Sequence, residues 1–132
     1  MTKTPRIVSI DQRALIVNSE GQVLLVRESE LDWDLPGGLL REAMGWRESL
    51  EDQIAELLDM QVVGSQPVYA ADYIDPVSGD YTYTSVVLCD VFSNGYDDGN
   101  YTEVKWVDLA DIPGLAFAAF DMKEAIISHF AK

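Results

Sequence analysis

The stretch WDLPGGLLREAMGWRESLEDQIAELLDMQV, residues 33–62, decides the fold of this chain. It begins with a Leu-Pro-Gly-Gly turn at 35–38, where proline fixes φ and the glycines reach backbone angles that cost other residues energy. A loop that turns at Gly45 leads into a predicted helix from Trp46 to Met60. At 3.6-residue spacing one side of this helix carries four apolar residues and a glutamine: Leu50, Ile54, Leu57, Leu58 and Gln61. A strand, a glycine turn and an acidic helix form a frame that can hold a metal ion against phosphate groups.

Three acids recur along the same helix. Asp52, Glu56 and Asp59 stand at positions i, i+4 and i+7, so their carboxylates form one continuous strip. Without a cation, each close pair of like charges destabilises the helix by roughly 0.2–0.5 kcal/mol. The strip has two interpretations: a reduced or relocated metal site, or a solvated acidic face in a very acidic protein.

The stretch resembles the Nudix box of Nudix hydrolases, which reads G-x5-E-x7-R-E-U-x-E-E-x-G-U with U apolar. Aligned without gaps from its first glycine, the sequence keeps four box residues: Gly38, Ile54, Glu56 and Met60. Five other box positions are replaced: the first Glu by Met44, the Arg by Asp52, the next Glu by Gln53, the second Glu of the pair by Leu57, and the last Gly by Asp59.

A second register lengthens the loop before the helix by three residues, a change that loops tolerate well. The segment from the box Arg to its final apolar residue then falls on residues 55–63. This register keeps Glu56, Leu57 and Val63, and it puts Asp59 in place of the first Glu of the pair. Three box residues are replaced: the Arg by Ala55, the last Glu by Met60 and the Gly by Val62. Both registers stay open on the sequence, and Glu56 is the one carboxylate that they share.

The resemblance implies that helix carboxylates hold Mg²⁺ or Mn²⁺, which bridges a diphosphate and activates the attacking water. It assigns Glu56 as the catalytic residue and a metal ligand, with Asp52 and Asp59 as further ligands. A later acidic residue completes the metal site in some family members, and the candidates for it are Glu103, Asp97 and Asp98. Because most box carboxylates are replaced, we expect hydrolysis to be weak or impaired.

Substrate-binding residues are also implied by the resemblance: Gly37 and Gly38 of the turn, Arg27 at the end of a predicted strand, and Arg41 in the following loop. Both arginines are open to a second interpretation, as solvated surface charges. A predicted strand pair at 62–74 and 81–92 carries four tyrosines: Tyr69, Tyr73, Tyr81 and Tyr83. Their rings either form a wall for a base or sugar, with Tyr73 as a binding residue, or pack against each other across the strands.

The order of predicted elements resembles the Nudix fold along nearly the whole chain. We therefore expect a single domain over residues 1–132, an α/β/α sandwich with a mixed curved β-sheet between the box helix and the C-terminal helix. Because a fold does not establish an activity, two functions stay open. One is a divalent-metal-dependent hydrolase of nucleoside diphosphates linked to another group. The other is a non-catalytic Nudix domain, without a cofactor, that binds a nucleotide-like metabolite or a protein partner; a homodimeric structural subunit is a third reading.

The composition and net charge exclude some classes of binding partner. Apolar residues make up 48% of the chain and charged residues 24%, which is typical of globular proteins. The excess of 23 acidic over 9 basic residues gives a net charge of −14, which repels bulk nucleic acid and anionic membranes. The single Cys89 lies in an apolar run, so we expect an inert buried thiol and a reducing, cytoplasmic location. Neither a signal peptide nor an apolar run near the ~20 residues of a membrane span is found.

Overall fold

The structure is a computed structural model that describes residues 8–28, 32–74, 78–92, 99–118 and 120–131. Its elements follow in the order β1 (Ser9–Ile16), β2 (Gln22–Arg27), β3 (Gly37–Leu39), α1 (Trp46–Leu58), β4 (Gln61–Ile74), β5 (Tyr81–Phe92), β6 (Glu103–Asp108), the 3-10 helix η1 (Leu109–Gly114) and α2 (Phe120–Phe130). Asp97 and Asp98, two candidates for the later metal ligand, lie outside the described residues.

The larger sheet has the strand order β3-β1-β5-β4. β1 runs parallel to β5 and antiparallel to β3, and β4 runs antiparallel to β5. β2 and β6 form a separate antiparallel pair. The larger sheet therefore contains both strand orientations, as the sequence predicted.

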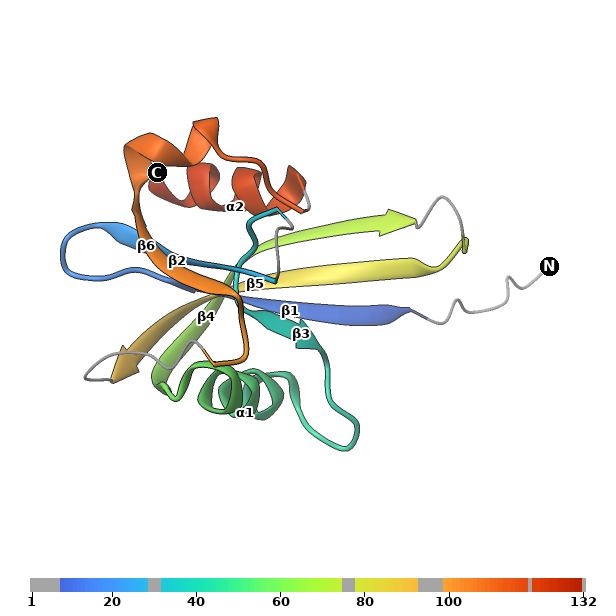
Figure 1. Ribbon diagram of the computed structural model, residues 1–132. Helices are drawn as coiled ribbons and strands as arrows, with labels where there is room; N and C mark the ends of the chain where they lie inside the picture. The colour runs from blue at the N-terminus through green and yellow to red at the C-terminus, as the bar shows by residue number, and fades with distance from the viewer. Residues whose placement is uncertain (1–7, 29–31, 75–77, 93–98, 119, 132) are drawn as a thin grey trace.

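The two helices cover opposite faces of the strands (Figure 1). Successive residues of β1 point to opposite faces, so Ala14 and Ile16 enter the core under α1 while Leu15 enters the core under α2. β2 divides in the same way, with Leu24 on the α1 side and Leu25 on the α2 side. This arrangement confirms the predicted α/β/α sandwich.

Helix α1 forms because its apolar residues recur on one side. Leu50, Ile54 and Leu58 are buried against the strands, which is the face that the periodicity predicted. The helix ends at Leu58, two residues earlier than expected, because Asp59 adopts left-handed backbone angles with φ 54°. The Asn100 side-chain amide donates to two carbonyl oxygens of the last turn at 3.2 Å, which fixes a later loop to this end of the helix.

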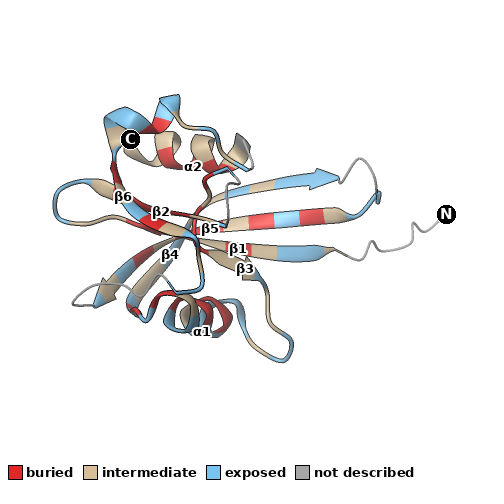
Figure 2. Ribbon diagram, viewed as in Figure 1, coloured by how far each residue is buried: buried red, intermediate tan, exposed pale blue. Residues whose placement is uncertain are grey.

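Outer parts of the long strands extend past both helices (Figure 2). On the α1 side this region leaves Ile10, Tyr83 and Ile74 exposed. On the α2 side it forms one wall of a cavity described below. In the parts of the chain that the structure describes, no helix combines the length and apolar character needed to cross a membrane.

Cys89 lies in the core under α1, as predicted. Burial raises the pKa of its thiol to about 12, with a smaller contribution from the charge of Asp90. The thiol therefore stays protonated at neutral pH, which fits an inert core residue.

Candidate functional site

The glycine turn brings β3 against β1. Gly37 pairs with Arg13 and has φ 149°, and a Cβ atom at this position would lie 2.0 Å from the Gln12 carbonyl oxygen. Only glycine fits such a close approach. This contact places the turn, including the predicted binding residues Gly37 and Gly38, beside the polar middle of β1.

A cavity of about 500 Å³ with both polar and apolar lining lies between the outer part of the sheet and α2. Side chains from three strands contribute most of its polar lining: Asp11, Arg13, Tyr73, Thr82 and Thr84. Met122 of α2 closes one side, and Gly38 and Leu39 of β3 form an edge. Two of the predicted substrate-binding residues, Tyr73 and Gly38, are therefore brought together in one cavity.

The four tyrosines do not form one wall. Thr82 and Thr84 face the cavity, so Tyr83 between them points to the opposite face of the sheet. Tyr69 packs into the core under α2. The period of two along each strand thus leaves Tyr73, 49% exposed, as the tyrosine that lines the cavity.

Arg13 is the basic residue in the lining of this cavity, and its guanidinium is already paired with neighbouring groups. Its Nε and one terminal nitrogen donate to the two carboxylate oxygens of Asp11, both at 2.9 Å. The other terminal nitrogen donates to the Leu35 carbonyl oxygen at 3.1 Å and lies 3.3 Å from Asp34. Burial raises the pKa of Asp34, although Arg13 and the Leu35 amide oppose that shift. Arg13 is thus paired with two aspartates, and a third, Asp80, also lines the cavity. The cavity therefore favours groups that donate hydrogen bonds over anions.

A smaller cavity of about 170 Å³ shares Arg13 and Asp34 with the first and reaches Arg27 and Tyr101. Arg27 donates to Glu103 at 2.6 Å and lies over the Trp33 ring, 4.6 Å from its centroid. The predicted binding residue Arg27 and the predicted metal ligand Glu103 are therefore brought together as an ion pair on the paired strands β2 and β6.

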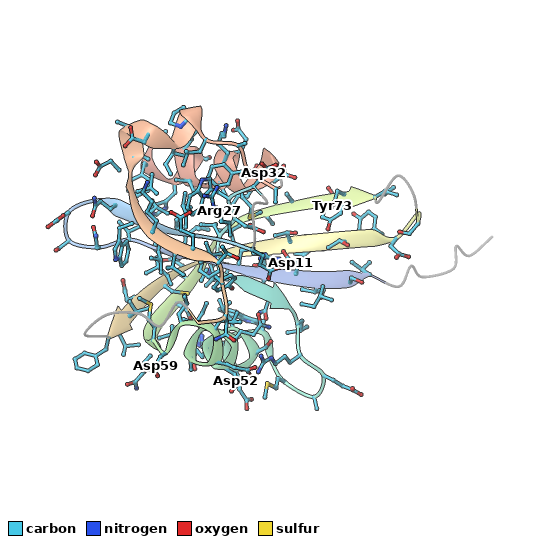
Figure 3. All side chains as sticks on the ribbon, viewed as in Figure 1. Asp11, Arg27, Asp32, Asp52, Asp59 and Tyr73 are labelled. Carbon is cyan, nitrogen blue, oxygen red and sulfur yellow. The ribbon has the colours of Figure 1, made fainter. Side chains whose placement is uncertain are left out.

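The predicted ligands on α1 lie elsewhere. Figure 3 shows Asp52 on α1 and Asp59 just past its end, on the other side of the sheet from Arg27 and Tyr73. Asp52 and Glu56 both form ion pairs with Arg41, and the distance from Arg41 to Glu56 is 2.8 Å. Asp59 follows the helix as its C-cap.

These residues do not fit a divalent ion. Such an ion requires several charged oxygens around one point. Among the described residues, no group of three or more His, Cys, Asp or Glu side chains is arranged to hold a metal. Of the predicted metal ligands, Asp52 and Glu56 are already paired with the guanidinium of Arg41. Glu103 is paired with Arg27.

Gln53, which stands where the box has a glutamate, is a further reason why α1 does not fit a divalent ion. Its side chain is 3% exposed, and its amide nitrogen donates to the Leu39 carbonyl oxygen at 2.8 Å and to Ser49 Oγ at 3.1 Å. A carboxylate could donate neither bond. The amide oxygen is buried, and among the described residues it has no hydrogen-bond partner. At this position the chain therefore has a structural amide that ties α1 to β3.

The geometry favours the gapless register of the box. In that register the final Gly falls on Asp59, whose φ of 54° lies in the region that glycine prefers, and the final apolar residue is Met60, 3% exposed. The shifted register puts the Gly on Val62, which pairs with Val91 inside the sheet, and the apolar residue on Val63, which is 61% exposed.

Several residues that line the cavity were not predicted as site residues from the sequence: Asp11, Arg13, Asp34, Thr82 and Thr84. A signal was present in the polar segment Asp11-Gln12-Arg13 within an otherwise apolar strand. The segment does not reveal its own partners, which come from Asp34 and from β5 about seventy residues later.

Comparisons with known proteins agree with this architecture. No protein-family model matches the sequence, and no curated protein matches it significantly. Solved structures do match. A NUDIX hydrolase from Nitrosomonas europaea is 13% identical with a TM-score of 0.81, over 95% of this chain and 90% of that one. A MutT NUDIX hydrolase from Burkholderia pseudomallei is 21% identical with a TM-score of 0.79, over 92% and 98%.

A third match is the NUDIX domain of Shewanella oneidensis NrtR in complex with ADP-ribose, which is 18% identical with a TM-score of 0.73, over 98% of this chain and 89% of that one. At such identities the likeness concerns the fold. The chain has the Nudix fold.

Proposed function

We propose that this chain is a Nudix-family protein that binds a small nucleotide-like ligand in the cavity between the sheet and α2. We further propose that its box is degenerate and that metal-dependent hydrolysis is weak or absent. The observation that carries both proposals is that a cavity with polar side chains adjoins the glycine turn, while Asp52 and Glu56 of α1 are paired with Arg41, and no described group of three acids is arranged to hold a metal.

The chemistry of the cavity suits a base or a sugar. The hydroxyl groups of Tyr73, Thr82 and Thr84 both donate and accept, and the carboxylates of Asp11 and Asp34 accept. Bases and sugars carry N–H and O–H donors for these acceptors, whereas phosphates would meet the carboxylates of Asp11, Asp34 and Asp80 and an arginine that is already paired. Phosphate groups should therefore point out of the cavity. The ADP-ribose complex of the Shewanella oneidensis NUDIX domain supports a ligand of this class.

The tyrosines of the sheet provide a matched test. Tyr73 lines the cavity, and Tyr83 is similarly exposed on the opposite face. In calorimetric titrations with ADP-ribose and a panel of nucleoside diphosphate derivatives, Tyr73→Ala should weaken binding by about tenfold, because one ring contact contributes about 1 kcal/mol or more. Tyr83→Ala should bind like the wild type. Equal binding by the two variants would place the ligand outside this cavity.

A hydrolase that cleaves nucleoside diphosphates linked to another group is the second candidate. Glu56 favours it, because this carboxylate matches the box in both registers and its side chain is 64% exposed. In that case Glu56 would be the catalytic residue, and Mg²⁺ or Mn²⁺ would be held by Glu56, Asp52 and Asp59 with help from Glu103. Glu56→Gln should abolish any metal-dependent hydrolysis of the nucleotide panel. Unaltered turnover in this variant would exclude Glu56 as the catalytic residue.

A further inference from the structure

Arg41 is fixed to α1 through its backbone as well as its side chain. Its backbone N–H donates to Ser49 Oγ at 3.0 Å, and the preceding Leu40 N–H donates to the Ile10 carbonyl oxygen at 2.7 Å. Ser49 is fully buried and also accepts the Gln53 amide. The loop that carries Arg41 is therefore held at two successive residues, one bonded to β1 and one to the helix.

The guanidinium then spans two acids one helical turn apart. Its terminal nitrogens contact Asp52 and Glu56, with 2.8 Å between Arg41 and Glu56. A planar guanidinium presents donors in a fixed fork, which allows one arginine to serve two carboxylates. Without a cation these acids would repel each other at i and i+4. The contacts are partly exposed, so their effect depends on the network and on the anchored loop more than on either pair alone.

We propose that Arg41 is the resident cation of α1 and takes the place of a divalent ion, so that the fold of this chain does not depend on Mg²⁺ or Mn²⁺. Three features support one another. Arg41 pairs with both helix acids and offsets one of their two negative charges, Gln53 replaces a carboxylate with a buried amide, and Leu57 packs against the core under α1. This inference rests on the proposed degenerate box but not on the ligand in the cavity, so the ligand proposal and this one can fail separately.

The test compares Arg41→Gln with Arg47→Gln. Arg47 also carries a positive charge, in the first turn of α1, but its side chain donates to Ser65 Oγ at 3.1 Å and lies over the ring of Trp46. Each protein is titrated with Mn²⁺ and followed by electron paramagnetic resonance, and its Tm is measured with Mn²⁺ and with a chelator. The wild type and Arg47→Gln should show no Mn²⁺ binding below millimolar concentrations and no metal-dependent change in Tm.

Arg41→Gln should have a lower Tm than Arg47→Gln. It should bind Mn²⁺ about tenfold more tightly than the wild type, because two adjacent carboxylates lose their counter-charge. Mn²⁺ should restore part of its Tm. Tight Mn²⁺ binding by the wild type, or equal Tm and equal Mn²⁺ affinity in the two variants, would overturn the proposal. If Arg41→Gln does not fold, Arg41→Lys, which keeps the charge, should remain as indifferent to Mn²⁺ as the wild type; a Tm that requires Mn²⁺ in this variant would overturn the proposal too.

Discussion

At the scale of single residues, Gln53 differs from a metal-binding glutamate by one group, an amide nitrogen in place of a carboxylate oxygen. An amide nitrogen at this buried position donates to the Leu39 carbonyl oxygen and to Ser49 Oγ. A glutamate of nearly the same shape would carry two acceptors and no donor at neutral pH. The sequence identified Gln53 as a replaced box residue, but the reason for an amide lies in its partner on β3.

We predict that Gln53→Glu lowers the free energy of unfolding by about 2–4 kcal/mol, because a buried charge would face a carbonyl oxygen and lose two hydrogen bonds. The control is Gln61→Glu at an exposed position on β4, which should change stability by less than about 0.5 kcal/mol. Urea denaturation near neutral pH measures both. Equal stability of the two variants would contradict the structural role of the amide.

Asp59 gives a second prediction for a single residue. Its φ of 54° is strained for a residue with a Cβ atom, although aspartate tolerates this region better than most. Asp59→Gly should therefore raise the free energy of unfolding by about 0.5–1 kcal/mol, and Asp59→Ala should lower it. Thermal denaturation would show the opposite signs directly. A destabilised glycine variant would mean that the Asp59 side chain itself stabilises the helix end.

At the scale of elements, the helix and the long strands could be predicted because their signals are local. Apolar spacing gave the buried face of α1, and alternation gave the hairpin of β4 and β5. The cavity could not be predicted, because Asp11 and Arg13 meet Thr84 only through the parallel pairing of β1 with β5. The pairing of Arg41 with α1 could not be predicted either, because it depends on how the loop after β3 folds back onto α1.

The end of α1 offers a prediction at this scale. Asn100 donates to the carbonyl oxygens of Glu56 and Leu57, which no helical amide can reach. Asn100→Ala should cost about 0.5–1 kcal/mol of stability, because these hydrogen bonds are exposed. Hydrogen exchange should accelerate in the last turn of α1 more than in its first turn. Uniform acceleration along the helix would show that Asn100 acts on the whole fold instead of this end.

At the scale of the whole molecule, charge is the dominant feature. A net charge of −14 places most surface groups in a repulsive field, which opposes the compact state and is screened by salt. The single-domain organisation, the cytoplasmic location and homodimer formation stay predictions from the sequence. The Nudix fold itself is shared with the solved structures described above.

We predict that the Tm rises with salt, because screening weakens this self-repulsion. Sodium chloride and magnesium chloride at equal ionic strength should raise the Tm to a similar extent, since Arg41 already pairs with Asp52 and Glu56 on α1. Differential scanning calorimetry provides the comparison. A Tm that rises only with magnesium would indicate a specific site for the ion.

The most direct measurement is a calorimetric titration of the purified chain with ADP-ribose, once with Mg²⁺ and once with a chelator, followed by chromatography of the recovered nucleotide. We predict the same dissociation constant in both buffers and intact ADP-ribose at the end, because the ligand occupies the cavity beside Tyr73 and α1 carries its own cation. Binding that requires Mg²⁺, or cleavage of ADP-ribose in its presence, would contradict a Nudix fold that recognises its ligand without a metal ion.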